Sequence, residues 1–92
     1  MEQKIKIVPF SEMGVISFLR NEISCIEEFK QNEKTDKANI YLKSGMSVTI
    51  ENEQGKYVSY ADCIFNSDSP NLDIYVGTAR VKRAERTLSF QL

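Results

Sequence analysis

The chain has 92 residues, 41% of them hydrophobic, with a formal net charge of −1. This length suits one domain with one modest core, so residues 1–92 are predicted to form a single domain. There is no histidine, and no stretch approaches the roughly 18 apolar residues of a membrane span, which excludes histidine-based catalysis and a membrane segment.

The two cysteines, Cys25 and Cys63, lack the CxxC spacing of a zinc site. Both are predicted to pack in the core as small apolar side chains, and we expect no metal and no cofactor. The first ten residues, MEQKIKIVPF, lack the apolar core of a signal peptide. We therefore expect a cytoplasmic protein with reduced thiols and no membrane partner.

Apolar and charged residues alternate from Lys4 to Val8, which predicts a short strand near residues 4–8 that ends by Pro9. The next segment, residues 11–31, is ambiguous. Its apolar residues at spacings of 3, 4 and 3 predict an amphipathic helix, and the residues concerned are Ile16, Leu19, Ile23 and Ile26. Its content of β-branched and serine residues instead favours two strands, and this alternative stays open.

Alternation is clearest in the segment that follows. Residues 38–65 are predicted to form a three-stranded antiparallel meander with tight turns at Ser44-Gly45 and at residues 52–55. Further strands are predicted near residues 72–77 and 87–92, where Leu, Ile, Val and Phe alternate with polar residues. Residues 78–86 are predicted to form either one helical turn or the tip of a long hairpin.

A helix with one apolar stripe must bury it, and a sheet face is the available partner. The predicted fold class is therefore α+β, with one amphipathic helix packed on a mostly antiparallel β-sheet.

A resemblance follows if residues 23–30 form a strand instead. ISCIEEF, followed by ANIYLKSGMSVTIENEQ, resembles the pattern I-x-x-I-E … I-x-L-x-x-G … V of flagellar FlbD-like proteins and LytTR DNA-binding domains. It lies within residues 23–54, and the Arg/His-containing signature of LytTR domains has no counterpart in a chain without histidine. Neither family is assigned, but the resemblance implies that nucleic-acid binding remains an alternative.

No catalytic motif is present, and the chain is predicted not to be an enzyme. The adjacent carboxylates Glu27 and Glu28 are interpreted as part of a solvated helix face, because neighbouring helix positions point about 100° apart.

The better functional candidate is an open face of the sheet. If the alternating apolar residues of the strands face the helix, four polar and aromatic residues face away: Tyr41, Thr49, Tyr57 and Tyr75. Exposed tyrosines are enriched in protein interfaces, and they also stack on bases. The alternative is that Tyr is simply a good strand former on a half-exposed face.

The end of the chain is basic, with Arg80, Lys82, Arg83 and Arg86 against Glu85. The leading hypothesis is a small interaction module, such as an inhibitor, adaptor or regulatory subunit, that binds a protein partner. A nucleic-acid-binding regulator that uses these basic residues is the second hypothesis. The predicted strand 87–92 is a candidate edge for a homodimer. The abundance of Lys, Asn, Ile and Glu is typical of an AT-rich bacterial or phage genome.

Overall fold

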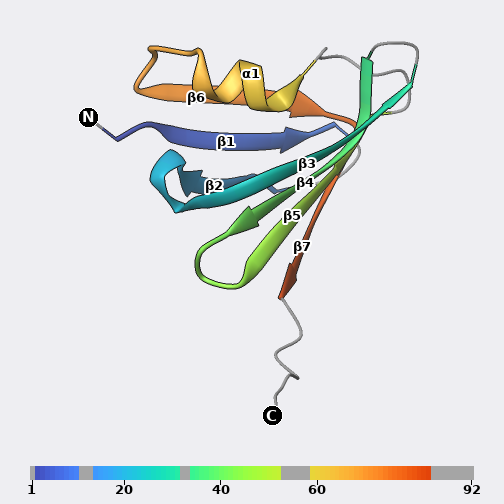
Figure 1. Ribbon diagram of the computed structural model, residues 1–92, viewed down its shortest axis with the longest axis horizontal. Helices are drawn as coiled ribbons and strands as arrows, with labels where there is room; N and C mark the ends of the chain where they lie inside the picture. The colour runs from blue at the N-terminus through green and yellow to red at the C-terminus, as the bar shows by residue number, and fades with distance from the viewer. Residues whose placement is uncertain (1, 11–13, 32–33, 53–58, 84–92) are drawn as a thin grey trace.

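The structure is a computed structural model that describes residues 2–10, 14–31, 34–52 and 59–83 (Figure 1). Within these ranges the chain is mostly β, with two sheets, one 3-10 turn and one short α-helix. No helix in them has the length and hydrophobicity needed to cross a membrane.

The first sheet, sheet A, has the strand order β2-β1-β6. Strand β1 (Lys4–Pro9) lies in its centre, antiparallel to β2 (Ile16–Leu19) and parallel to β6 (Asn71–Val76). Side chains alternate between the two faces of a strand, so Ile5 and Ile7 are buried while Lys4 and Lys6 are exposed. The strands predicted near residues 4–8 and 72–77 are thus confirmed.

The second sheet, sheet B, is antiparallel throughout, with the order β3-β4-β5-β7. Its strands are β3 (Ile23–Gln31), β4 (Lys34–Leu42), β5 (Met46–Glu51) and β7 (Thr78–Arg83). The turn between β4 and β5 contains Gly45 with a φ of 97°, a conformation that glycine adopts without steric cost. The first two strands of the predicted meander are confirmed as β4 and β5.

Three connections join the sheets, and the one from β5 to β6 lies partly outside the described residues. The 3-10 turn η1 (Arg20–Glu22) leads from β2 into β3, and the Leu19 amide donates a hydrogen bond to Glu22 Oε1 at 2.8 Å. At the other end of the molecule, Gly77 alone separates β6 from β7, and the chain bends there from sheet A into sheet B (Figure 1). Strands that pass between sheets at bends are typical of orthogonally packed β-sheets.

One core serves both sheets and the helix. Buried side chains come from β1, β2 and β6 of sheet A, from β4, β5 and β7 of sheet B, and from α1 (Tyr60–Phe65). The helix contacts β3, and its Tyr60 and Ile64 are buried in the same core cluster as residues of both sheets.

The long helix predicted over residues 11–31 is wrong, because the described part of this segment is β2, η1 and β3. Residues 11–13 lie outside the described ranges. The apolar spacing of the segment arises from two strands on either side of a turn, which mimics a helical stripe. Hence the molecule is a two-sheet β structure with one short helix, and an amphipathic helix does not pack on a single sheet.

Three smaller predictions also change. The helix α1 occupies residues 60–65, where the third strand of the meander was predicted. Strand β7 occupies most of residues 78–86, which were predicted to form a helical turn or a hairpin tip. The Cys25 side chain is exposed in β3, whereas Cys63 is partly buried in α1 and burial raises the pKa of its thiol. The predicted strand 87–92 lies outside the described residues.

Candidate functional site

The outer face of sheet B is the side turned away from the core. The strand register places its residues in three rows that cross all four strands. The rows are Phe29–Lys37–Glu51–Thr78, Glu27–Asn39–Thr49–Arg80 and Cys25–Tyr41–Ser47–Lys82. The alternating residues in between, such as Ile40 and Val48, face the core. Because successive side chains of a strand point to opposite faces of the sheet, every second residue of each strand lies on this face.

The central row is held together by hydrogen bonds between side chains. Thr49 Oγ1 donates to Asn39 Oδ1 at 2.8 Å, and Asn39 Nδ2 donates to Glu27 Oε1 at 3.0 Å. Tyr41 Oη donates to the same carboxylate oxygen at 2.9 Å. We call these four residues the polar network. Its members come from three strands, so the network fixes the side chains of an exposed surface in one arrangement.

The network changes the ionisation of its two titratable groups. Hydrogen bonds from Asn39 and then Tyr41 hold the pKa of Glu27 below its usual value. The hydrogen bond to Glu27 raises the pKa of the Tyr41 phenol, because ionisation would remove its proton and place two negative charges side by side. At neutral pH the network thus consists of an ionised carboxylate and a neutral phenol.

Tyr41 is expected to titrate at a higher pH than an ordinary tyrosine, and Glu27→Gln should bring its pKa back down because the negative acceptor is removed. The change is measured by NMR titration of ring-labelled tyrosine, with the wild-type chain under the same conditions as the reference. Below the lowered pKa of Glu27 the carboxylate becomes protonated, so the Tyr41 and Asn39 signals should shift in the same acidic pH range. An unchanged Tyr41 pKa in Glu27→Gln would show that the hydrogen bond does not form in solution.

The structure brings some predicted site residues together and separates others. Tyr41 and Thr49 are both on the outer face of sheet B, in the polar network. Tyr75 lies in β6 of sheet A, where its ring stacks on Phe10 with centroids 6.0 Å apart. The remaining tyrosine of the predicted face, Tyr57, lies outside the described residues.

The basic residues Arg80, Lys82 and Arg83 all lie in β7, and their side chains are exposed. Two of them, Arg80 and Lys82, belong to the outer face of sheet B. Arg86 lies outside the described residues. Arg80 and Lys82 of the predicted phosphate-binding set thus share one surface with Tyr41 and Thr49 of the predicted open face.

Glu27, Phe29, Lys37 and Asn39 are among the residues of this face that sequence reasoning missed. Phe29 is 44% exposed, and Lys37 Nζ lies 5.8 Å from the centre of its ring, within the range of a cation–π contact. Reading residues 23–31 as a strand would have placed Cys25, Glu27 and Phe29 on one side. That signal was present in the sequence, but the helical spacing of the apolar residues concealed it.

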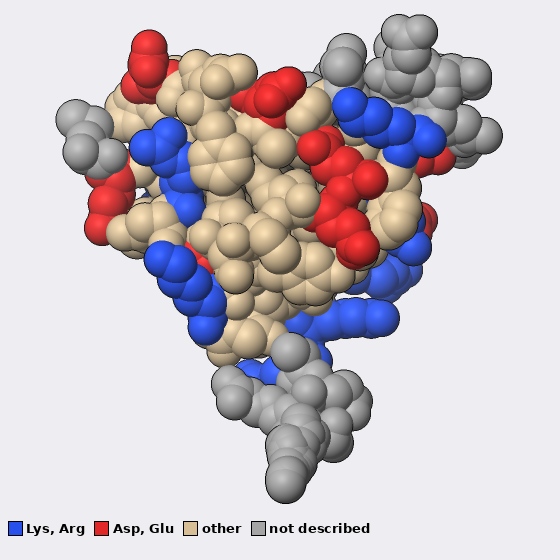
Figure 2. All heavy atoms as spheres, in the orientation of Figure 1, with Lys and Arg blue, Asp and Glu red and all other residues tan. Residues whose placement is uncertain are grey.

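Charge is unevenly distributed on the molecule. Figure 2 shows acidic side chains over the β3 side of sheet B and basic side chains beside β7. Glu27 and Glu51 supply negative charge within the outer face of sheet B, whereas Arg80 and Lys82 supply positive charge at its β7 edge. A partner for this face must therefore present both signs of charge in a matching order.

A hollow of about 760 Å³ lies where the sheets meet at Gly77. Its lining includes Phe10 from the end of β1, Lys37 and Glu51 from sheet B, and Thr78 at the start of β7. The mixture of one aromatic ring with both signs of charge does not single out a ligand class. Because Lys37, Glu51 and Thr78 also belong to the outer face of sheet B, the hollow is continuous with one end of that face.

Among the described residues, no group of three or more Cys, Asp or Glu side chains is arranged to hold a metal ion. Comparison of the chain with protein-family models, with curated proteins and with solved structures finds no match.

Proposed function

We propose that this protein is a small non-enzymatic interaction module that binds a protein partner through the outer face of sheet B. The observation that carries the proposal is the polar network, which fixes an exposed tyrosine and its neighbours on a four-stranded sheet face. Side chains ordered before binding lose less conformational entropy when the partner arrives. Tyrosine adds rigid contact area with a polar tip and is enriched among the residues that dominate binding energy.

The positions of the carboxylates favour binding over catalysis. Glu27 lies on the outer face, while Glu28 points inward and accepts hydrogen bonds from Ser59 and from the Tyr60 amide at the start of α1. The two adjacent acids are therefore on opposite sides of sheet B and do not act on one substrate. Glu28 has a structural task, and Glu27 is occupied by the polar network.

The proposal is tested with a matched pair of tyrosines. Tyr41 and Tyr75 have similar exposed fractions of 37% and 40% but lie on different sheets. Partners are captured from bacterial lysate after nuclease treatment, identified by mass spectrometry, and titrated in purified form. Tyr41→Ala is expected to weaken binding about tenfold or more, as for a central tyrosine of an interface, whereas Tyr75→Ala should leave it close to wild type.

Circular dichroism of both variants serves as the control for folding. Loss of binding in Tyr75→Ala with retention in Tyr41→Ala would place the interface on sheet A and contradict the proposal. Equal retention in both folded variants would remove the tyrosines of the described sheets from the interface altogether.

Nucleic-acid binding is the second candidate, and the exposed Arg80, Lys82 and Arg83 on one strand favour it. The neighbouring carboxylates of Glu27 and Glu51 count against it, because they would repel a phosphate backbone that crossed the outer face. Titration with a single-stranded oligonucleotide at several salt concentrations separates the two candidates.

A further inference from the structure

We propose that the second half of β7, Val81–Arg83, receives an extended acidic segment of the partner protein as a further strand of sheet B. The inference rests on the proposed function and names the chemistry of the partner. In the described residues β7 is the last strand of its sheet, and its whole length pairs with β5 on one side. The last strand of a sheet offers its outer backbone groups to a further strand, a recurrent mode of peptide recognition.

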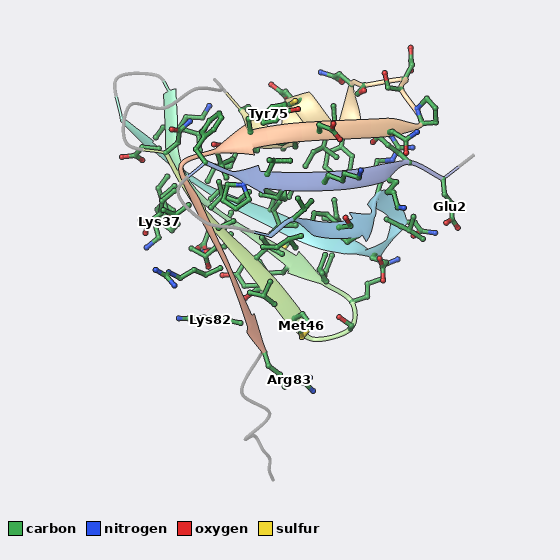
Figure 3. All side chains as sticks on the ribbon, turned by 180° about the vertical axis from the view of Figure 1, so that it is seen from behind. Glu2, Lys37, Met46, Tyr75, Lys82 and Arg83 are labelled. Carbon is green, nitrogen blue, oxygen red and sulfur yellow. The ribbon has the colours of Figure 1, made fainter. Side chains whose placement is uncertain are left out.

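The second half of β7 extends away from the core. Val81 is 45% exposed, although Val48, its neighbour across the pair, is only 1% exposed. Lys82 and Arg83 are exposed as well. Figure 1 shows this end of β7 projecting away from sheet A, and Figure 3 shows Lys82 directed away from the strand and Arg83 at its end. An added strand would meet no other element of the described structure there.

The two faces of this half of β7 differ in chemistry, and they determine the sequence of the incoming strand. Lys82 lies on the outer face, whereas Val81 lies on the inner face, in the row of Ile40 and Val48, and Arg83 ends the strand. Side chains of the incoming strand alternate in the same way. A matching strand therefore carries an acidic residue beside Lys82 on the outer side and an apolar residue next to Val81 on the inner side.

Charge also argues against a second copy of this chain as the occupant. Pairing of two β7 strands would bring the cations Lys82 and Arg83 of both copies into one small region. Like charges on paired strands are destabilising, and basic residues on an edge strand are a common means of preventing self-association. An acidic segment turns the same charges into favourable cross-strand pairs.

The probe is the capped peptide acetyl-Glu-Val-Glu-Val-Glu-Val-amide, titrated into the full chain labelled for NMR. Binding should shift the amide signals of Val81, Lys82 and Arg83 and slow their hydrogen exchange. The paired variant Lys82→Glu/Arg83→Glu should weaken binding at least tenfold and should now bind the corresponding Lys-Val peptide. These results would support strand addition, and the variant's thermal unfolding confirms that it is folded.

Three controls can overturn the inference. A Glu-Ser peptide that binds as well as the Glu-Val peptide would reduce the interaction to charge alone. A single-stranded oligonucleotide that binds more tightly, with affinity that falls steeply with salt, would favour nucleic acid instead. If Lys82→Glu/Arg83→Glu retains the cellular partner while Tyr41→Ala loses it, strand addition is rejected and the proposed interface stands.

Discussion

Replacing Glu28 with alanine is expected to lower the free energy of unfolding by about 2–4 kcal/mol. Hydrogen bonds to a charged group are strong, and the substitution removes the acceptor of donors that are buried. The Glu28 carboxylate accepts three hydrogen bonds: from Thr35 Oγ1 at 3.0 Å, from Ser59 Oγ at 3.0 Å and from the Tyr60 amide at 2.7 Å. Thr35 and Tyr60 are fully buried. This one side chain therefore joins β3, β4 and the start of α1.

The adjacent Glu27→Ala provides the matched control, since it removes the same chemical group from the exposed side of β3 and should leave stability close to wild type. Both variants are compared by urea denaturation followed by far-ultraviolet circular dichroism. Glu28→Gln keeps one acceptor oxygen and should fall between wild type and Glu28→Ala. Equal stability of the Glu27 and Glu28 variants would mean that the two side chains do not lie on opposite faces of a strand.

Strand β3, which carries both glutamates, shows where sequence reasoning fails. Strands with uninterrupted alternation were predicted, because Ile5 and Ile7, or Val48 and Ile50, mark the buried face directly. Strand β3 was not predicted in this way, because its pairing with β4 shifts register between Ile23 and Cys25 and again between Phe29 and Lys30. Such irregularities break the period of two.

The helix α1 depends on a contact that the sequence does not display. Its six residues, YADCIF, include several strand-forming types, and a helix this short has little intrinsic stability. Ser59 caps it by accepting a hydrogen bond from the Asp62 amide at 3.1 Å, and Glu28 binds the Tyr60 amide from another part of the chain. Tertiary contacts thus decide between strand and helix at residues 60–65.

Only part of the candidate site was predictable, because the position of some residues depends on pairing between distant segments of the chain. Tyr41 and Thr49 lie on neighbouring strands of a hairpin, so local alternation was sufficient to place them on one face. The position of Tyr75 depends on the parallel pairing of β6 with β1, which joins segments at opposite ends of the described chain. Two sheets were therefore not distinguishable from one, and a tyrosine of sheet A was predicted to share a face with a tyrosine of sheet B.

Replacing Gly77 with alanine is expected to lower the free energy of unfolding by about 1–3 kcal/mol, the usual cost of inserting an atom where there is no room. A Cβ at this position would lie 2.9 Å from the backbone oxygen of Glu51 and 3.6 Å from Asn52 Cα. Backbone atoms do not rotate away as a side chain would, so either the end of β5 or the bend between the sheets must move.

The expected loss corresponds to a decrease in melting temperature of about 4–8 °C per kcal/mol for a domain of this size. Thr78→Ala, which removes atoms at the next residue, serves as the control and should have the smaller effect. Hydrogen exchange should localise the damage in Gly77→Ala to β7 and the end of β5, where Glu51 pairs with Thr78. Full stability of Gly77→Ala would show that the two sheets do not approach so closely at this bend. A localised loss would instead show that the bend positions β7, and with it the edge proposed to receive the acidic strand.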